Sequence, residues 1–156
     1  MRQSNQALSY LREACRLRPH DRELLGFYDE IEARPLILAV DDSKTVQKMI
    51  STVLEKEAYR VSPAEDGLAA LAKLDEELPQ LVLLDITMPR MDGYQVCKVI
   101  TGNEGTKHIP VIMLSGKDGF FDKVKGKMAG ASNYITKPFD PNELIKTVGK
   151  FVKKKK

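Results

Sequence analysis

The chain has 156 residues, of which 42% are hydrophobic and 30% are charged. This composition is typical of one folded domain with a short appendage and unlike that of a disordered chain. The net charge of +3 comes from the tail Lys153–Lys156, because residues 1–34 are neutral and residues 35–152 carry −1. This distribution argues against nucleic-acid binding, and no apolar run approaches the roughly 18 to 20 residues that membrane insertion needs.

Two further features predict a cytoplasmic location. The N-terminus leads into a charged stretch with no apolar signal core. The two cysteines, Cys15 and Cys97, provide neither a disulfide framework nor the spacing of a metal site. Reduced thiols are therefore expected.

Residues 1–34 predict a short helical extension. Ala7, Leu11, Ala14 and Pro19 are spaced as in the second helix of a tetratricopeptide repeat, which this segment resembles, and a helix from Asp21 to about Ala33 follows. A helix pair of this size cannot bury its apolar face alone. We expect it to pack on the rest of the chain, on a second copy or on a partner, unless the chain is a fragment of a larger signalling protein.

Residues 35–152 alternate short apolar runs with amphipathic stretches, which predicts five strand–helix units. Such units form a doubly wound parallel sheet with helices on both faces. Met49, Met113 and Met128 lie at apolar positions and are expected in the core. The predicted strands are 36–40, 59–62 (a weaker, edge-like strand), 81–84, 111–114 and 133–136, and the predicted helices are 43–58, 67–78, 94–101, 120–129 and 142–155.

Polar side chains follow the apolar strands, where ligands bind in such sheets. Each one alone could be a helix cap or a loop residue. Together they suggest phosphoryl transfer, because crowded carboxylates favour a hard cation such as Mg²⁺. A carboxylate can accept a phosphoryl group, while an ammonium and a hydroxyl stabilise its oxygens. These residues are Asp41, Asp42, Asp85, Ser115 and Lys137.

Residues 35–152 resemble the receiver domain of two-component response regulators. Asp85 and Ser115 are 30 residues apart, and Ser115 and Lys137 are 22 apart, as in that family. The resemblance implies a flavodoxin-like fold with strand order 2-1-3-4-5. Segments 43–45 and 117–123 further resemble the single-domain regulators of chemotaxis and twitching motility. The matching motifs are Val40-Asp-Asp-Ser43, Leu84-Asp-Ile-Thr-Met-Pro-Arg-Met-Asp-Gly93, Met113-Leu-Ser-Gly116 and Tyr134-Ile-Thr-Lys-Pro-Phe139.

The resemblance implies a role for each of these positions. Asp85 would be the phosphoacceptor, with Ser115 and Lys137 contacting the phosphoryl group and Gly116 keeping the adjacent backbone close to it. Asp42 would bind Mg²⁺ directly and Asp41 through water, together with Asp85 and the Thr87 carbonyl. Tyr134 would be the switch aromatic, although a half-buried strand aromatic is the plainer interpretation. Lys137–Pro138 would be a cis bond, and Thr87 and Lys117 would occupy variable positions beside the site.

The implied function is a signalling switch and not an enzyme. A histidine kinase or phosphotransfer protein would phosphorylate Asp85, and the face of the fourth helix, fifth strand and fifth helix would bind a protein effector, such as motility or chemosensory machinery. A homodimer through the extension or the switch face is a further expectation. An alternative is a haloacid-dehalogenase phosphatase. That class needs a second aspartate where this chain has Thr87, which argues against it. A second alternative is a phosphorylation-independent scaffold, and the presence of the complete set of site residues argues against it.

Overall fold

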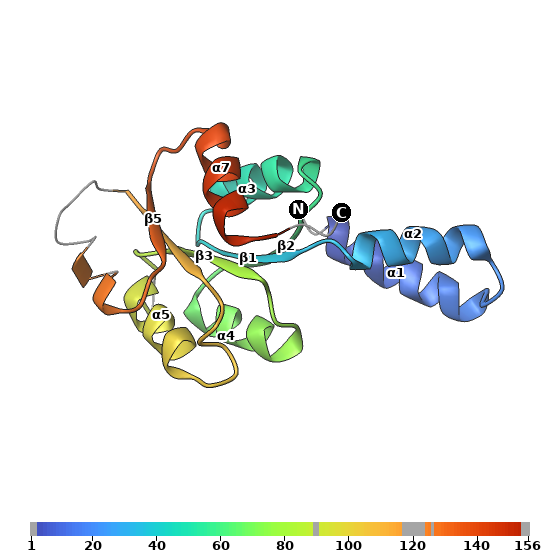
Figure 1. Ribbon diagram of the computed structural model, residues 1–156, viewed down its shortest axis with the longest axis horizontal. Helices are drawn as coiled ribbons and strands as arrows, with labels where there is room; N and C mark the ends of the chain where they lie inside the picture. Colours follow the sequence, from blue (N-terminus) through green and yellow to red (C-terminus); the bar gives the residue numbers. More distant parts are fainter. Residues whose placement is uncertain (1–2, 89–90, 117–123, 126, 154–156) are drawn as a thin grey trace.

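A five-stranded parallel sheet forms the centre of the computed structural model, which describes residues 3–88, 91–116, 124–125 and 127–153 (Figure 1). The strand order β2-β1-β3-β4-β5 confirms the predicted fold, including the edge position of β2. Each observed strand begins within one residue of its predicted start. The strands are β1 (Leu36–Val40), β2 (Arg60–Ala64), β3 (Leu81–Asp85), β4 (Val111–Ser115) and β5 (Asn133–Thr136).

Helices cover both faces of this sheet (Figure 1). α3 (Lys44–Lys56) and α7 (Pro141–Phe151) lie on one face, and α4 (Gly67–Glu76) and α5 (Gly93–Gly102) lie on the other. The side chain before each helix accepts a hydrogen bond from a backbone N–H of the first turn, which satisfies a donor without an intrahelical partner. These capping residues are Ser43, Asp66, Asp92 and Asp140.

Coverage on both faces explains why the strands are continuously apolar. Successive side chains of a strand point to opposite faces, so Leu38 and Val40 pack in the cluster under α4 and α5, and Ile37 and Ala39 pack in the cluster under α3 and α7. Every residue of β1, β3 and β4 is buried. The carboxyl ends of these strands are therefore held rigidly.

Two details of the prediction are wrong. The last helix ends at Phe151 and not near Lys155, because Val152 adopts an extended conformation and is buried against the sheet. Met128 is 79% exposed, although Met113 is buried and Met49 packs on the core as expected. The predicted helix 120–129 and the tail Lys153–Lys156 lie partly outside the described residues.

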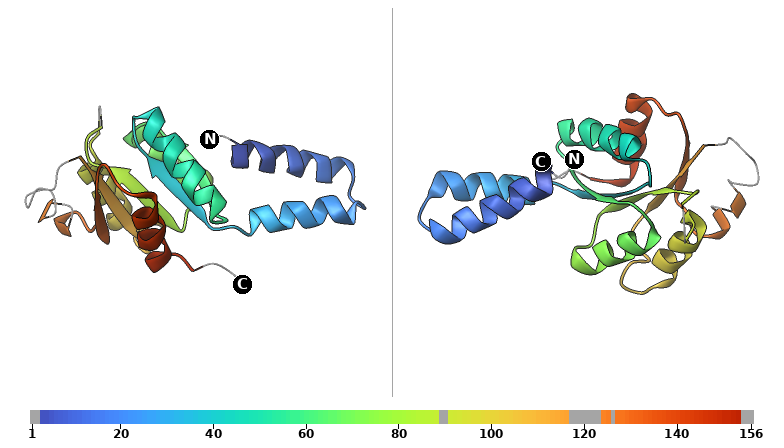
Figure 2. Two further views of the ribbon diagram at one scale, coloured as in Figure 1. Left: turned by 90° about the horizontal axis from the view of Figure 1, so that it is seen from above. Right: turned by 180° about the vertical axis from the view of Figure 1, so that it is seen from behind.

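The extension forms a pair of antiparallel helices, α1 (Gln3–Leu17) and α2 (Arg22–Glu32), that projects from the sheet (Figures 1 and 2). Asp21 caps α2, and its carboxylate accepts a hydrogen bond from the Leu24 N–H. β1 begins four residues after α2 ends. The hairpin therefore lies at the amino ends of the strands, opposite the edge where Asp41 and Asp85 lie. The tetratricopeptide resemblance stays a prediction.

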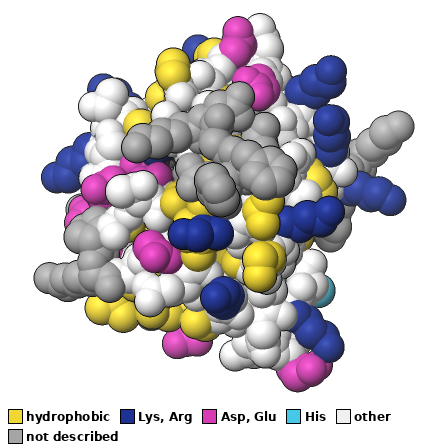
Figure 3. Space-filling model, turned by 90° about the vertical axis from the view of Figure 1, so that its left-hand side faces the viewer, with side chains coloured by type: hydrophobic (Ala, Val, Ile, Leu, Met, Phe, Trp, Pro, Cys, Tyr) yellow, Lys and Arg dark blue, Asp and Glu magenta, His cyan; other side chains and the backbone are white. Residues whose placement is uncertain are grey.

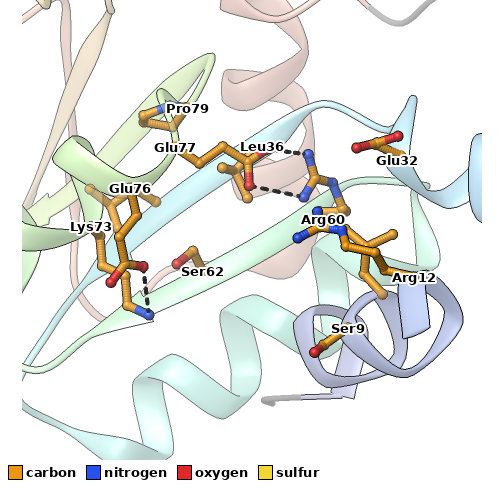
Figure 4. A pocket seen from close by; sticks show the side chains of 12 residues that line it. Ser9, Arg12, Glu32, Leu36, Arg60, Ser62, Lys73, Glu76, Glu77 and Pro79 are labelled. Atoms are coloured by element: carbon orange, nitrogen blue, oxygen red, sulfur yellow. Dashed lines mark hydrogen bonds and ion pairs between the residues drawn. The ribbon is translucent and has the colours of Figure 1, made fainter. Parts of the chain in front are cut away.

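A cleft of about 450 Å³ lies between α1 and the strands β1 and β2 (Figure 4). Leu8 is buried there, and Arg12 and Glu32 contribute from the hairpin. On the opposite wall, the guanidinium of buried Arg60 donates two hydrogen bonds to the Glu77 carboxylate, the shorter at 2.6 Å. This ion pair holds together the side of the cleft that faces the hairpin. Among the described helices, none has the length and apolar character of a membrane span.

Two helical glycines should respond oppositely to alanine. A Cβ at Gly93 would lie 2.2 Å from the Asp85 carbonyl oxygen, so Gly93→Ala should lower the free energy of unfolding by about 1–3 kcal/mol, as overpacking does. A Cβ at Gly149 in α7 meets nothing within 4 Å, so Gly149→Ala should raise it by about 0.5–1 kcal/mol. Urea unfolding of the two variants measures both signs. Equal effects would contradict the close packing at Gly93.

Candidate functional site

Three carboxylates meet at the carboxyl edge of the sheet. Asp41 and Asp42 follow β1, and Asp85 ends β3, the neighbour of β1. One carboxylate oxygen from each lies within 4.8 Å of the others. Asp41 and Asp85 are buried, whereas Asp42 is exposed. The structure therefore brings together the acidic residues that the sequence singled out.

Lys137 places a positive charge between the two buried carboxylates. Its Nζ lies 2.5 Å from Asp41 Oδ2 and 3.4 Å from Asp85 Oδ1. The residue directly follows β5, and its backbone N–H donates a hydrogen bond to the Ser115 carbonyl at the end of β4. The Lys137–Pro138 bond is cis, as the resemblance implied. The long side chain thus reaches from the sheet edge, across β4, to the end of β3.

The pKa of Asp85 is raised to about 6, chiefly by burial and also by the neighbouring charge of Asp41. The Lys137 ammonium and the Thr87 N–H, which donates to Asp85 Oδ1 at 3.3 Å, act in the opposite direction. The ammonium thus offsets only part of the cost of ionising Asp85. A further cation at this edge would stabilise the ionised carboxylate.

The donor set fits Mg²⁺. This ion prefers oxygen ligands, retains several waters and is typically held by one or two carboxylates. Asp41 is already engaged, because its Oδ1 accepts the Ser43 N–H at 2.8 Å and its Oδ2 accepts Lys137. Asp42 is exposed and available, which suits the predicted division between a direct and a water-mediated ligand. Thr87 is exposed and lies two residues beyond Asp85.

Ser115 and Tyr134 connect the site to β5. Ser115 is buried and lies beside Thr136 in the sheet, one residue past the partner of Asp85. Tyr134 is partly buried and packs on the cluster under α4 and α5. At Gly116, a Cβ would meet no described atom within 4 Å, and the expected approach of its backbone to a phosphoryl group stays a prediction. Lys117 and Pro89 lie outside the described residues.

The family model for the response regulator receiver domain matches residues 37–149. The chain belongs to the receiver family. It is 48% identical over 109 residues to protein PilG of Pseudomonas aeruginosa, a match that covers 70% of this chain and 81% of PilG. Protein PilH of the same organism is 43% identical over 112 residues, or 72% of this chain and 93% of PilH.

A solved structure extends the likeness to three dimensions. The chemotaxis protein CheY4 of Vibrio cholerae superposes with a TM-score of 0.73 at 34% identity, over 76% of this chain and 99% of CheY4. The likeness thus covers the receiver fold. Residues 1–34 precede the span that the family model matches.

Sequence reasoning missed two residues that position this receiver site. Gln47 in α3 is buried, and its side-chain amide donates at 2.7 Å to the carbonyls of both Asp41 and Ala64. It thereby joins the ends of β1 and β2. Gly93 ends one of the matching motifs, and in the structure its N–H donates to the Ile86 carbonyl and its backbone packs against that of Asp85. A polar residue on the apolar side of the predicted helix was the available signal for Gln47.

The raised pKa of Asp85 predicts a pH dependence of both stability and metal binding. Because folded Asp85 keeps its proton to a higher pH than unfolded Asp85, the stability that it contributes should be lost as pH rises from about 4 to 6. In Mg²⁺-free buffer at neutral pH, Asp85→Asn should therefore raise the free energy of unfolding by about 1–2 kcal/mol. The difference from the native chain should vanish below pH 4.

Urea unfolding across this pH range measures the effect. Asp42→Asn is the matched control, because it makes the same charge change at an exposed carboxylate and should shift stability far less. Calorimetry should also show Mg²⁺ binding weakened about tenfold at pH 5 relative to pH 7, since the proton on Asp85 competes with the ion. Affinity independent of pH would contradict Asp85 as a ligand.

Proposed function

We propose that this protein is a phosphorylation-controlled switch in which Asp85 accepts a phosphoryl group in a Mg²⁺-dependent reaction. The observation that carries the proposal is the Lys137 ammonium, held within 3.4 Å of both buried carboxylates. In a purely structural ion pair, the lysine would need only one carboxylate partner. Two carboxylates, with a third alongside, leave excess negative charge for a cation.

The side chains divide the chemistry between them. An oxygen of ionised Asp85 forms the new bond to phosphorus while the bond from phosphorus to the donor's imidazole nitrogen breaks, and the imidazole leaves with the electron pair. Lys137 then donates to one phosphoryl oxygen and the Ser115 hydroxyl to another. When bound, Mg²⁺ would neutralise charge on the phosphoryl oxygens, held by Asp42, Asp85, the Thr87 carbonyl and, through water, Asp41.

The phosphoryl donor is proposed to be a histidine kinase or a phosphotransfer protein. The chain has two histidines. His20 lies in the turn between α1 and α2, and His108 precedes β4. Both positions lie toward the amino ends of the strands, away from Asp85, which supports a donor histidine on another protein.

The output is proposed to be protein binding through the face of residues 120–129, β5 and α7. Figure 3 looks at this side of the molecule, where hydrophobic side chains lie among lysines and arginines. Met128 and Val124 are exposed there. Movement of Ser115 toward a phosphoryl group would be transmitted to Tyr134 along the adjoining strands. The resemblance to chemotaxis and twitching-motility regulators supports an effector in motility or chemosensory machinery.

The chemistry is proposed to be confined to phosphorylation and dephosphorylation of the protein's own Asp85, without a separate substrate. The exposed Thr87 offers no general acid where a haloacid-dehalogenase phosphatase has one. Cys15 and Cys97 are free, which suits a reducing compartment and supports the cytoplasm as the place of action.

Acetyl phosphate should phosphorylate the native chain only when Mg²⁺ is present. Asp85→Asn should abolish the modification, because it removes the attacking oxygen. Asp75→Asn, the same change at an exposed position of α4, should leave it intact. Intact-protein mass spectrometry measures the phosphoryl group. A native chain that takes up no phosphate would favour the phosphorylation-independent scaffold and overturn the proposal.

The proposed coupling between Ser115 and Tyr134 leads to a second prediction. Tyr134→Ala should retain phosphorylation but lose beryllofluoride-dependent partner binding, because the ring would no longer reshape the face around β5. Tyr134→Phe keeps the ring and serves as the control. Pull-downs from lysate with and without beryllofluoride compare the three chains. Full beryllofluoride-dependent binding by Tyr134→Ala would exclude this route.

A further inference from the structure

The α1–α2 hairpin is anchored on the receiver at two points in the described part of the chain. Leu8 is 5% exposed and lines the cleft together with Leu36 and Leu38 of β1. Among residues 7–33, whose burial the structure describes, Leu8 is the one buried side chain. The second point is the linker between α2 and β1, which contacts Arg60. Because the hairpin brings little buried surface to the receiver, its orientation depends heavily on these two contacts.

Arg60 connects three segments of the chain at the amino end of the sheet. Its Nε donates a hydrogen bond of 3.4 Å to the carbonyl of Arg34 in the linker. Its Nη1 and Nη2 donate at 3.3 and 2.6 Å to the two carboxylate oxygens of Glu77, which directly follows α4 (Figure 4). Its backbone N–H donates to the Pro35 carbonyl. One residue of β2 therefore holds both the linker and the end of α4.

The position of the guanidinium depends on Glu77. Arg60 is 4% exposed, and burial of a charge is costly unless an opposite charge compensates it. Glu77 supplies that charge through two hydrogen bonds, the arrangement that fits a planar guanidinium. The Glu77 side chain is itself 53% exposed. The pair thus fixes the direction in which Nε points, and with it the bond to the linker.

The other charged side chains of the cleft pair within their own segment. Arg12 donates to the Tyr28 hydroxyl, which in turn donates to Glu32, and all three belong to the hairpin. Lys73 lies 3.8 Å from Glu76, and both belong to α4. Among the side-chain hydrogen bonds and ion pairs described at the cleft, those of Arg60 are therefore the ones that join the receiver to the linker of the hairpin.

The receiver fold alone does not account for this contact. The family model matches residues 37–149, so Arg60 and Glu77 lie inside the matched span and Arg34 lies outside it. Of the 19 basic residues in 35–156, 17 are lysine. A lysine has a single nitrogen and cannot donate to a carboxylate and a carbonyl in the fixed directions of a guanidinium. Arginine at position 60 therefore suits a residue that holds two partners.

We propose that Arg60 and Glu77 form a clasp that sets the orientation of the hairpin on the receiver. While the clasp is closed, Arg60 holds the Arg34 carbonyl, and the hairpin and the sheet move as one rigid body. When the Glu77 carboxylate is removed, the guanidinium turns toward solvent in the cleft, which it lines, and releases the linker. The hairpin then reorients about residues 33–35 while the sheet stays folded.

The clasp lies at the amino ends of the strands, opposite Asp85 (Figures 1 and 4). The proposal therefore goes beyond the proposed function and does not depend on phosphorylation. A closed clasp would hold any partner of the hairpin at a fixed position relative to the receiver.

Residual dipolar couplings of the backbone amides in the full chain test the proposal. In the native chain, one alignment tensor should fit the amides of α1, α2 and the sheet. In Glu77→Ala, the hairpin amides should need a separate tensor at least twofold smaller in magnitude. The strand amides should keep the native fit, which shows that the variant is folded. A native hairpin that already needs its own smaller tensor would overturn the proposal, as would a Glu77→Ala hairpin that keeps the native one.

Glu76→Ala is the matched control. It removes the neighbouring glutamate, whose exposed carboxylate lies 3.8 Å from Lys73 and is not bound to Arg60. Its hairpin should stay aligned as in the native chain. Release of the hairpin to the same extent as in Glu77→Ala would contradict the clasp.

Arg60→Lys separates the linker contact from the ion pair. The lysine keeps a positive charge for Glu77 but lacks the second nitrogen that reaches the Arg34 carbonyl. Its hairpin should be released as in Glu77→Ala, with the strand amides unchanged. A folded Arg60→Lys chain whose hairpin keeps the native tensor would show that the packing of Leu8 and the linker orients the hairpin, and would overturn the proposal.

Discussion

The site depends on one ammonium group shared by two buried carboxylates. Lys137 directly follows β5, Asp85 ends β3 and Asp41 directly follows β1. Their meeting requires the strand order in which β1 and β3 are neighbours and β4 separates β3 from β5. A shift of one residue in any of these strands would turn the functional side chain to the other face. The continuous apolar packing of the strands is what fixes that register.

The same interaction leaves the site with unbalanced charge. One ammonium cannot compensate two buried carboxylates and a third that lies beside them. The pKa of Asp85 is raised chiefly by burial and also by the charge of Asp41. An ion or phosphoryl group that binds here changes the charge balance of all three strand ends at once. In the proposed switch, this change would reach Ser115 on β4 and Tyr134 on β5. The hairpin, at the opposite end of the sheet, is free to serve a separate purpose.

The sequence predicted most of the fold because the receiver is built from elements that differ clearly in pattern. Apolar runs marked the buried strands, and a polar residue after each run marked the site. Helix ends were harder to predict. The lysines after Phe151 suit a helix terminus, but the burial of Val152 draws the chain into an extended conformation. Met128 has an apolar side chain, and nothing local in the sequence indicates that it is exposed.

The supporting contacts of the site were not predictable in the same way. Gln47 occupies a position that looks like any polar interruption of a helix, and its role depends on two carbonyls from different strands. In the sequence, Gly93 looks like an ordinary turn residue. Only the structure shows that it packs against the Asp85 backbone. Likewise, the spacing in residues 1–34 predicted helices but not the direction in which they project. Each of these features depends on contacts between segments far apart in the sequence.

The most direct test of the account is an NMR titration of the Asp85 side-chain carboxyl carbon, with and without saturating Mg²⁺. The account predicts a midpoint near pH 6 without the ion. It also predicts a lower midpoint with the ion, because a bound cation favours the ionised carboxylate. A midpoint near the ordinary value of 3.8 that Mg²⁺ does not move would contradict it.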